Sequence, residues 1–175
     1  MRIEIDHKGD KKFFSEILNI SVQYGQLLKN PRKKLKNLLM RPYCYLAAFA
    51  LLLVIDIVLF FLYGARKVQI LYALLCVAFM VRNIYAIRKN NGIIKRMAEQ
   101  EEKEILQLDE EGVSLISENK DTMHMAWSNV AFLRQFKQEF CFMGKTGMMF
   151  SIDPGRKEEI LRYIKEHSIP VEVIE

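Results

Sequence analysis

The sequence predicts an α+β membrane protein: a hairpin of two transmembrane helices joined to a cytoplasmic antiparallel β-barrel that a C-terminal helix closes. Two apolar stretches, residues 43–63 and 68–87, are each about 20 residues long, enough at ~1.5 Å per residue to cross a ~30 Å hydrocarbon core. Beyond residue 103 the apolar side chains instead recur at every second position in short runs, which is typical of half-buried strands.

These patterns divide the chain into four parts. Residues 1–40 are expected to hold a strand, an amphipathic helix and a basic juxtamembrane segment, and residues 41–89 form the transmembrane hairpin. Residues 90–103 continue as a linker helix. Residues 104–175 form the barrel and its closing helix.

Charges beside the apolar stretches predict the orientation. Basic residues precede the first stretch and follow the second, whereas the connecting turn carries only Arg66 and Lys67. The positive-inside rule therefore places both termini in the cytoplasm. The segment 30–42 serves as this topology signal or, alternatively, lies at the headgroups and attracts anionic lipid. The juxtamembrane basic residues are Lys29, Arg32, Lys33, Lys34, Lys36, Arg41, Arg88 and Lys89.

The overall charge argues against a nucleic-acid partner. Residues 1–100 hold 17 Lys and Arg against 6 Asp and Glu, whereas residues 101–175 hold 9 against 15. The basic excess therefore belongs to the membrane-facing part, and the cytoplasmic part is acidic.

The N-terminal part carries two further periodic signals. Residues 2–7 alternate apolar and polar, so we expect a strand that joins the barrel across the hairpin insertion. Residues 10–30 place Phe13, Ile20 and Leu27 on one helical face. That face packs against the cytoplasmic domain or lies on the membrane surface, and the mixed charges on its flanks favour packing.

Six short runs predict the strands of the barrel: 104–109, 112–118, 122–127, 130–136, 139–145 and 147–153. Turn signals such as Asp-Glu-Glu-Gly and Gly-Lys-Thr-Gly separate them. Asp153 and Pro154 then begin an amphipathic helix, which ends near His167. The residues expected to anchor the barrel core are Met125, Trp127, Val130, Phe140 and Phe142.

The order of these elements resembles the YcxB-like family of bacterial two-span membrane proteins. The matching residues are LDEEGVSLISE (108–118), MAWSNV (125–130) and the Pro-started helix 154–167. The chain departs from the family pattern where Asp153 precedes Pro154. The resemblance implies a C-terminal pleckstrin-homology-like (PH-like) domain in the bacterial cell membrane. It implies no catalytic residues.

Asp56 interrupts the first apolar stretch with a carboxyl group, which is costly inside a bilayer. Arg82 is expected nearer the cytoplasmic interface, about 10 Å away in depth, so a direct pair within one hairpin is not expected. Asp56 then bonds to another helix in an assembly, is a tolerated neutral acid, or lines an ion path; we favour assembly. The assembly face comprises Leu52, Leu53, Asp56, Leu59 and Phe60.

The remaining polar residues do not match a catalytic or metal-binding motif, so we expect neither an enzyme nor a cofactor. His124 is interpreted as a surface residue. A phosphate-binding patch for lipid headgroups would need the later-loop cations, although the acidic turn 109–112 would repel phosphate. These cations are Arg134, Lys137, Lys145, Arg156 and Lys157.

The sequence therefore predicts a non-catalytic, membrane-anchored interaction protein. It binds a protein partner through the PH-like barrel, assembles through the hairpin, or does both, and no small-molecule substrate is inferred. Two alternatives remain open. One is an immunity protein that neutralises a membrane-active toxin, and the other is an accessory subunit of a transporter or membrane signalling complex.

Overall fold

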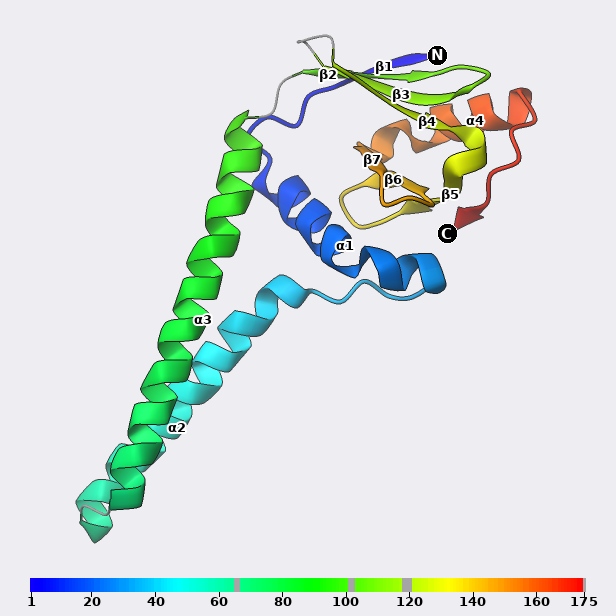
Figure 1. The fold of residues 1–175 in the computed structure, drawn as a ribbon. Coiled ribbons are helices and arrows are strands. Elements are labelled where there is room, and N and C mark those ends of the chain that lie inside the picture. Colours follow the sequence, from blue (N-terminus) through cyan, green and yellow to red (C-terminus); the bar gives the residue numbers. More distant parts are fainter. Residues whose placement is uncertain (65–66, 101–102, 118–120, 175) are drawn as a thin grey trace. The chain divides into compact units, whose positions relative to one another are not determined.

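The structure is a computed structural model that describes residues 1–64, 67–100, 103–117 and 121–174 (Figure 1). It contains two compact units. The β-unit combines Met1–Lys36 with Ile94–Glu175, and the hairpin unit comprises Asn37–Ile93. The β-unit is thus built from both sides of the hairpin in the sequence. Arg66, one of the two basic residues of the predicted turn, lies outside the described residues.

The first sheet of the β-unit has the strand order β1-β2-β3-β4, with each neighbouring pair antiparallel. β1 pairs with β2 in the register Ile3↔Leu106, so the predicted N-terminal strand does join the strands that follow the hairpin. The strands of this sheet are β1 (Arg2–Ile5), β2 (Glu104–Leu108), β3 (Gly112–Ser117) and β4 (Thr122–Ala126).

The second sheet has the order β7-β6-β5-β8. β5, β6 and β7 are antiparallel to one another, and the short β8 adds in parallel to β5. Its strands are β5 (Val130–Gln135), β6 (Phe140–Gly144), β7 (Met149–Ile152) and β8 (Val173–Ile174). The six strands expected after residue 103 are therefore confirmed, within a residue or two at their ends.

The sheets are not closed into a barrel, which corrects the predicted architecture. The short 3-10 helix η2 (Trp127–Asn129) separates β4 from β5, and no ladder joins these strands or joins β1 to β7 within the described residues. Alternation along a strand shows which face is buried but not which edges meet. Closure is therefore a tertiary property that the sequence pattern does not contain.

One hydrophobic core lies between both sheets and the C-terminal helix. After the 3-10 turn η3 (Pro154–Arg156), α4 (Lys157–Glu166) contributes Ile160 and Ile164. Asp153 begins this segment as expected, because its carboxylate accepts a hydrogen bond from Gly155 N–H at 2.6 Å. Of the expected core residues, Trp127 is half-buried and donates from Nε1 to the carbonyl of Asp109 at 2.9 Å. The others are buried: Met125, Val130, Phe140 and Phe142.

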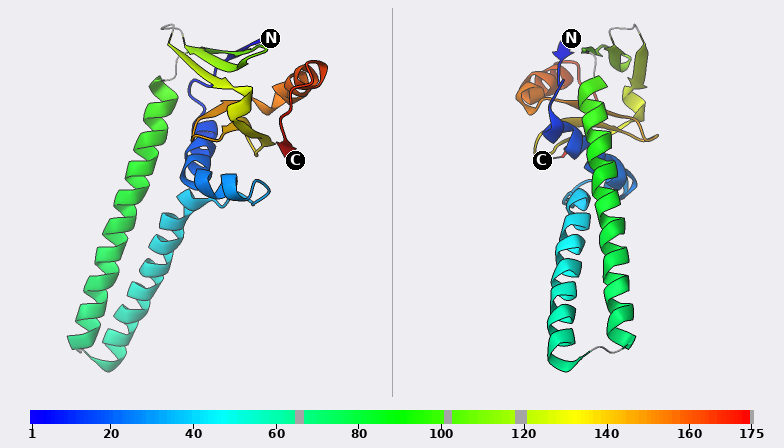
Figure 2. Two further views of the ribbon diagram at one scale, coloured as in Figure 1. Left: turned by 45° about the vertical axis from the view of Figure 1, so that its right-hand side comes forward. Right: turned by 90° about the vertical axis from the view of Figure 1, so that its left-hand side faces the viewer.

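The amphipathic segment forms α1 (Lys11–Lys29), capped by the carboxylate of Asp10. Its apolar face packs against the second sheet, where Ile20 and Leu27 share a core with Phe132 and Met143. Packing against the folded domain, the favoured of the two expectations, is thus confirmed. Figure 2 shows α1 from two further directions.

The hairpin unit consists of α2 (Arg41–Tyr63), preceded by the 3-10 turn η1 (Leu38–Met40), and most of α3 (Lys67–Gln100). Two helical segments, Leu38–Tyr63 and Lys67–Glu99, are long and apolar enough to cross a membrane. Their most apolar 18-residue windows have mean hydropathies of 2.7 and 2.0, respectively. Only 6% of the most apolar window of each is buried by protein, as expected for side chains that face lipid.

Candidate functional site

The most buried side chains of the described hairpin residues are those of Asp56 and Cys76. Asp56 is only 9% exposed, although the apolar residues beside it on α2 are largely open. Phe49 of α2 stacks on Phe79 of α3, with ring centroids 4.9 Å apart. The burial of Asp56 and the cavity that it lines with residues of α3 place it on the side of α2 that faces α3.

A cavity of about 270 Å³ opens beside Asp56 between the two helices. Gln69 of α3 is the other polar residue in its wall, and the small side chain of Ala73 leaves room there. Apolar residues complete the lining: Ile57, Phe60, Ile70, Leu74 and Val77. Polar side chains within membrane helices commonly face a partner helix because lipid offers no hydrogen bonds. The sequence analysis identified Asp56 but missed Gln69, whose signal is a polar residue in the first turn of the second apolar stretch.

The rest of the expected assembly face is more exposed than Asp56. Leu52, Leu59 and Phe60 have 36–43% exposure, and Leu53 is half-buried. Arg82 is exposed, and the ion pairs of the described residues do not include it. The acid and its neighbouring leucines therefore do not form one uniformly outward surface.

The basic segment after α1 is fixed to the β-unit through its backbone. Arg134 of β5 donates from one guanidinium nitrogen to the carbonyls of Pro31 and of Lys33, the latter at 2.9 Å. Gln23 of α1 donates to the carbonyl of Lys36 at 2.6 Å and accepts from its N–H at 3.1 Å. Residues 31–36 are therefore docked through main-chain groups, which leaves several of their cationic side chains exposed.

The exposed members of the juxtamembrane set lie in both units: Lys29, Arg32, Lys34 and Lys36 in the β-unit, and Arg41, Arg88 and Lys89 in the hairpin unit. Lys33 is half-buried and donates to Gln26 Oε1 at 2.8 Å.

Four of the five cations considered for a phosphate patch have partners within the β-unit. Arg134 holds the basic segment, and burial lowers the pKa of its guanidinium group. Lys145 donates to the carbonyl of Ser128 at 2.7 Å, and Lys157 donates to Gln135 at 3.0 Å. Arg156 pairs with Glu159 at 3.2 Å. These contacts do not converge on one anion site, which weighs against headgroup recognition there.

A buried acid that the sequence analysis missed lies directly before β6. The side chain of Glu139 is fully buried, and its Oε2 accepts from the Sγ of Cys141 at 3.5 Å. Cys141 in turn contacts the hydroxyl of Ser151 at 3.2 Å. Burial raises the pKa of Glu139 to about 8, and the carboxylate of Glu16 on α1 adds to this. Glu139 was expected as the first residue of the strand 139–145, directly after the polar Lys137 and Gln138, and nothing in this local pattern indicates that its side chain is buried.

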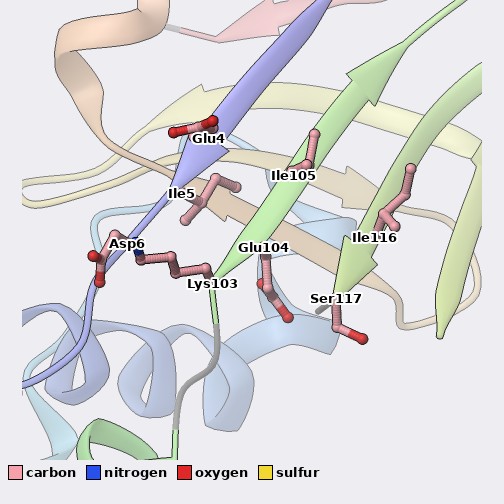
Figure 3. Close-up of a pocket in the computed structure, with 8 residues that line it drawn as sticks. All are labelled: Glu4, Ile5, Asp6, Lys103, Glu104, Ile105, Ile116 and Ser117. Atoms are coloured by element: carbon pink, nitrogen blue, oxygen red, sulfur yellow. The ribbon is translucent and has the colours of Figure 1, made fainter. Parts of the chain in front are cut away.

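The outer face of β1 also borders a cavity of about 310 Å³, shown in Figure 3. Glu4 and Asp6 lie on its β1 side, and Ile105 and Ile116 lie across it on β2 and β3. Lys103 extends from the start of β2 toward Asp6. This wall is therefore acidic at β1 and apolar across the sheet.

His124, expected at the surface, is exposed and contacts the hydroxyl of Ser114 through Nδ1 at 2.9 Å. Within the part of the chain that the structure describes, no group of three or more His, Cys, Asp or Glu residues is placed to hold a metal ion. No protein-family model, curated protein or solved structure matches this chain.

Proposed function

We propose that this chain is a non-catalytic, membrane-anchored interaction protein of the bacterial cell membrane, which binds a protein partner through its β-unit. The observation that carries the proposal is the contrast between the two units of the chain. The hairpin unit keeps its apolar side chains on the outside, whereas the β-unit has its own core and polar surface. Such a chain holds a folded binding domain at a membrane.

The PH-like assignment and the cytoplasmic placement of both termini belong to the same proposal. Two four-stranded sheets with a C-terminal helix packed on their shared core support a PH-like fold, even though the sheets are not closed. The basic flanks of the hairpin support the cytoplasmic placement.

Assembly through the hairpin receives less support than binding through the β-unit. Because Asp56 turns toward α3 within its own hairpin, it does not need a second protein to leave the lipid. We therefore assign Asp56 first to packing of the hairpin itself.

Affinity capture of the tagged full-length chain from native membranes in mild detergent tests the proposal, with mass spectrometry to count the partner. Three chains are compared: wild type, Asp56→Leu, and a chimera in which residues 37–93 are replaced by an unrelated two-span hairpin. We expect a stoichiometric partner with all three. Loss of the partner from both altered chains would show that the hairpin, and not the β-unit, binds it. If the wild-type chain captured only further copies of itself, the proposal of a protein partner would be overturned.

A further inference from the structure

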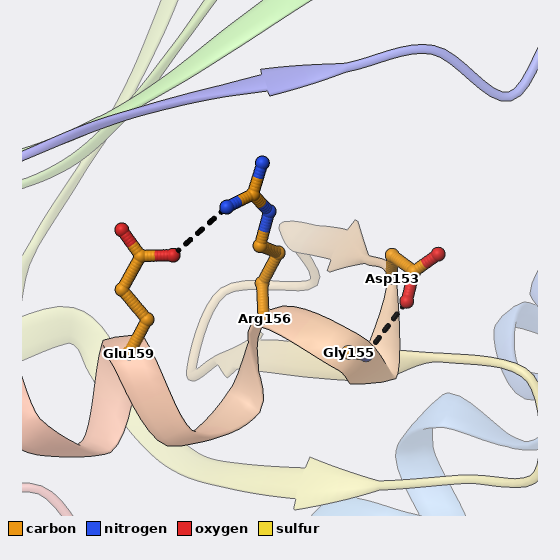
Figure 4. A network of polar contacts seen from close by, with 4 residues as sticks. All are labelled: Asp153, Gly155, Arg156 and Glu159. Carbon is orange, nitrogen blue, oxygen red and sulfur yellow. Dashed lines mark hydrogen bonds and ion pairs between the residues drawn. The ribbon is translucent and has the colours of Figure 1, made fainter.

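A groove of about 600 Å³ runs along the open side of β1. One wall is β1 with the residues that follow it, from Ile3 to His7; the other is the junction of β7 with η3, around Asp153 and Arg156. Figure 4 shows β1 passing over this junction, with Arg156 between them. The volume lies within the range of about 300–1,000 Å³ that is usual for binding pockets.

The main chain of β1 has hydrogen-bonding groups that point into this groove. The terminal amine of Met1 donates to the carbonyl of Leu108 at 2.7 Å, and the N–H of Leu108 donates to the carbonyl of Met1 at 2.9 Å. In an antiparallel pair the bonded residues alternate with residues whose N–H and C=O point outward. Arg2 and Glu4 therefore direct their main-chain groups away from β2. β1 is a sheet edge, the kind of surface to which an extended peptide adds as a further strand.

The charge of the groove selects the side chains of such a peptide. Glu4, Asp6 and Asp153 line it, and the described ion pairs of the chain do not include these three acids. The guanidinium of Arg156 is offset by Glu159. Lys103 of the same chain already extends toward Asp6 (Figure 3), as a lysine from a partner would on the open side.

We propose that the edge of β1 binds an extended, lysine-containing segment of a partner protein as an added strand. Alternate side chains of that segment face opposite sides of the sheet. One set lies beside Glu4 and Asp6, and the other enters the apolar seam that Ile3 and Ile152 border. The proposal rests on the proposed function, since it names the surface through which the β-unit engages its partner.

Binding of a fluorescent Lys-Val-Lys-Val-Lys-Val peptide to the full-length chain in nanodiscs tests this inference by anisotropy. The matched Glu-Val-Glu-Val-Glu-Val peptide is the charge control. We expect the lysine peptide to bind and the glutamate peptide not to bind. Equal binding of both peptides would overturn the charge argument.

Glu4→Pro separates a main-chain contact from a simple charge effect. Proline removes the outward N–H of residue 4 but leaves the β1–β2 bonds, which residues 3 and 5 make. We expect Glu4→Pro to weaken binding by about tenfold or more, and Glu4→Gln to weaken it less. Thr122→Pro alters the other free edge of the same sheet, at β4, and should leave binding unchanged.

Hydrogen exchange keeps the test valid if a proline variant folds poorly. In the wild-type chain, addition of the lysine peptide should slow exchange of the amides of Arg2 and Glu4 but not of β4. Protection at β4 instead, or unchanged affinity in a folded Glu4→Pro chain, would overturn the inference. If Glu4→Pro still captures the membrane partner, the β1 edge is excluded while the proposed function stands; if even wild type captures none, the proposed function itself fails.

Discussion

At the scale of single residues, the two most informative acids are both buried, and for different reasons. Asp56 lies on the side of α2 that faces α3 within the apolar hairpin, whereas Glu139 is enclosed by α1 and the second sheet, where Ile17, Cys141 and Ser151 lie beside it. The acid in an apolar run was visible in the sequence. The direction in which Asp56 faces could not be predicted, because a helix that is apolar on all sides does not show which face packs against its neighbour. The burial of Glu139 could not be predicted from local pattern, because α1, which covers it, lies more than a hundred residues earlier in the chain.

Glu139 makes the stability of the β-unit depend on pH. Its pKa rises from 4.5 to about 8 on folding, so the folded state holds a proton that the unfolded state releases between these values. The stabilisation of the folded state by the protonated carboxyl group of Glu139 is therefore fully present below about pH 4.5. It is lost as the pH rises through about 8. The slope is at most roughly 1.4 kcal/mol of unfolding free energy per pH unit.

Replacement Glu139→Gln should remove most of this slope, because glutamine keeps the shape but does not titrate. Chemical unfolding of both chains between pH 5 and pH 9 measures it. Glu16→Gln is the matched control: it removes the neighbouring carboxylate and should only lessen the slope. Parallel stability curves for wild type and Glu139→Gln would contradict the assignment.

At the scale of elements, most of the β-unit could be predicted, and the parts that could not are those set by distant contacts. Strands β2 to β7 follow from alternation and turn residues, α1 follows from its apolar stripe, and α4 follows from its Asp-Pro start and apolar stripe. The open seam between the sheets and the docking of residues 31–36 on Arg134 have no counterpart in local pattern. The basic residues of segment 31–36 indicate a position beside a membrane. They do not indicate whether the main chain of the segment is hydrogen-bonded to the β-unit.

The contact of Arg134 with this segment predicts a change in protease sensitivity. Arg134→Gln removes the charged donor to the carbonyls of Pro31 and Lys33, so the segment should open more often. We expect a lysine-specific protease to cut after Lys33 and Lys34 about tenfold faster. Arg162→Gln, an exposed position on α4, is the control and should cut at the wild-type rate. Equal rates in all three chains would show that Arg134 does not hold the segment.

At the scale of the whole molecule, the β-unit depends on residues that precede the hairpin. β1 and α1 supply Ile3, Ile5, Ile20 and Leu27 to its two hydrophobic cores, and each of these side chains is at most 4% exposed. The free energy lost when several fully buried aliphatic side chains are removed exceeds the free energy of unfolding of most small domains. We therefore expect that the part after the hairpin does not fold on its own.

A chain that starts at residue 94 should consequently fail to unfold cooperatively and should bind a hydrophobic dye. A fusion of residues 1–36 to residues 94–175 through a flexible Gly-Ser linker should restore a cooperative thermal transition. Circular dichroism and dye fluorescence measure both chains. Cooperative unfolding of the shorter chain would show that β1 and α1 are dispensable.

The pairing of β1 with β2 also constrains how this chain can be threaded through a bilayer. Strands that share a ladder must lie in the same compartment, so residues 36 and 94 are on one side whichever compartment that is. A hairpin that enters the membrane must therefore return, and a single crossing is incompatible with the folded sheet. During synthesis, β1 cannot pair with β2 until both helices of the hairpin have left the ribosome, because β2 follows them in the sequence. If the second apolar helix failed to cross, β1 and β2 would lie in different compartments, and the edge of β1 that now pairs with β2 would remain unpaired.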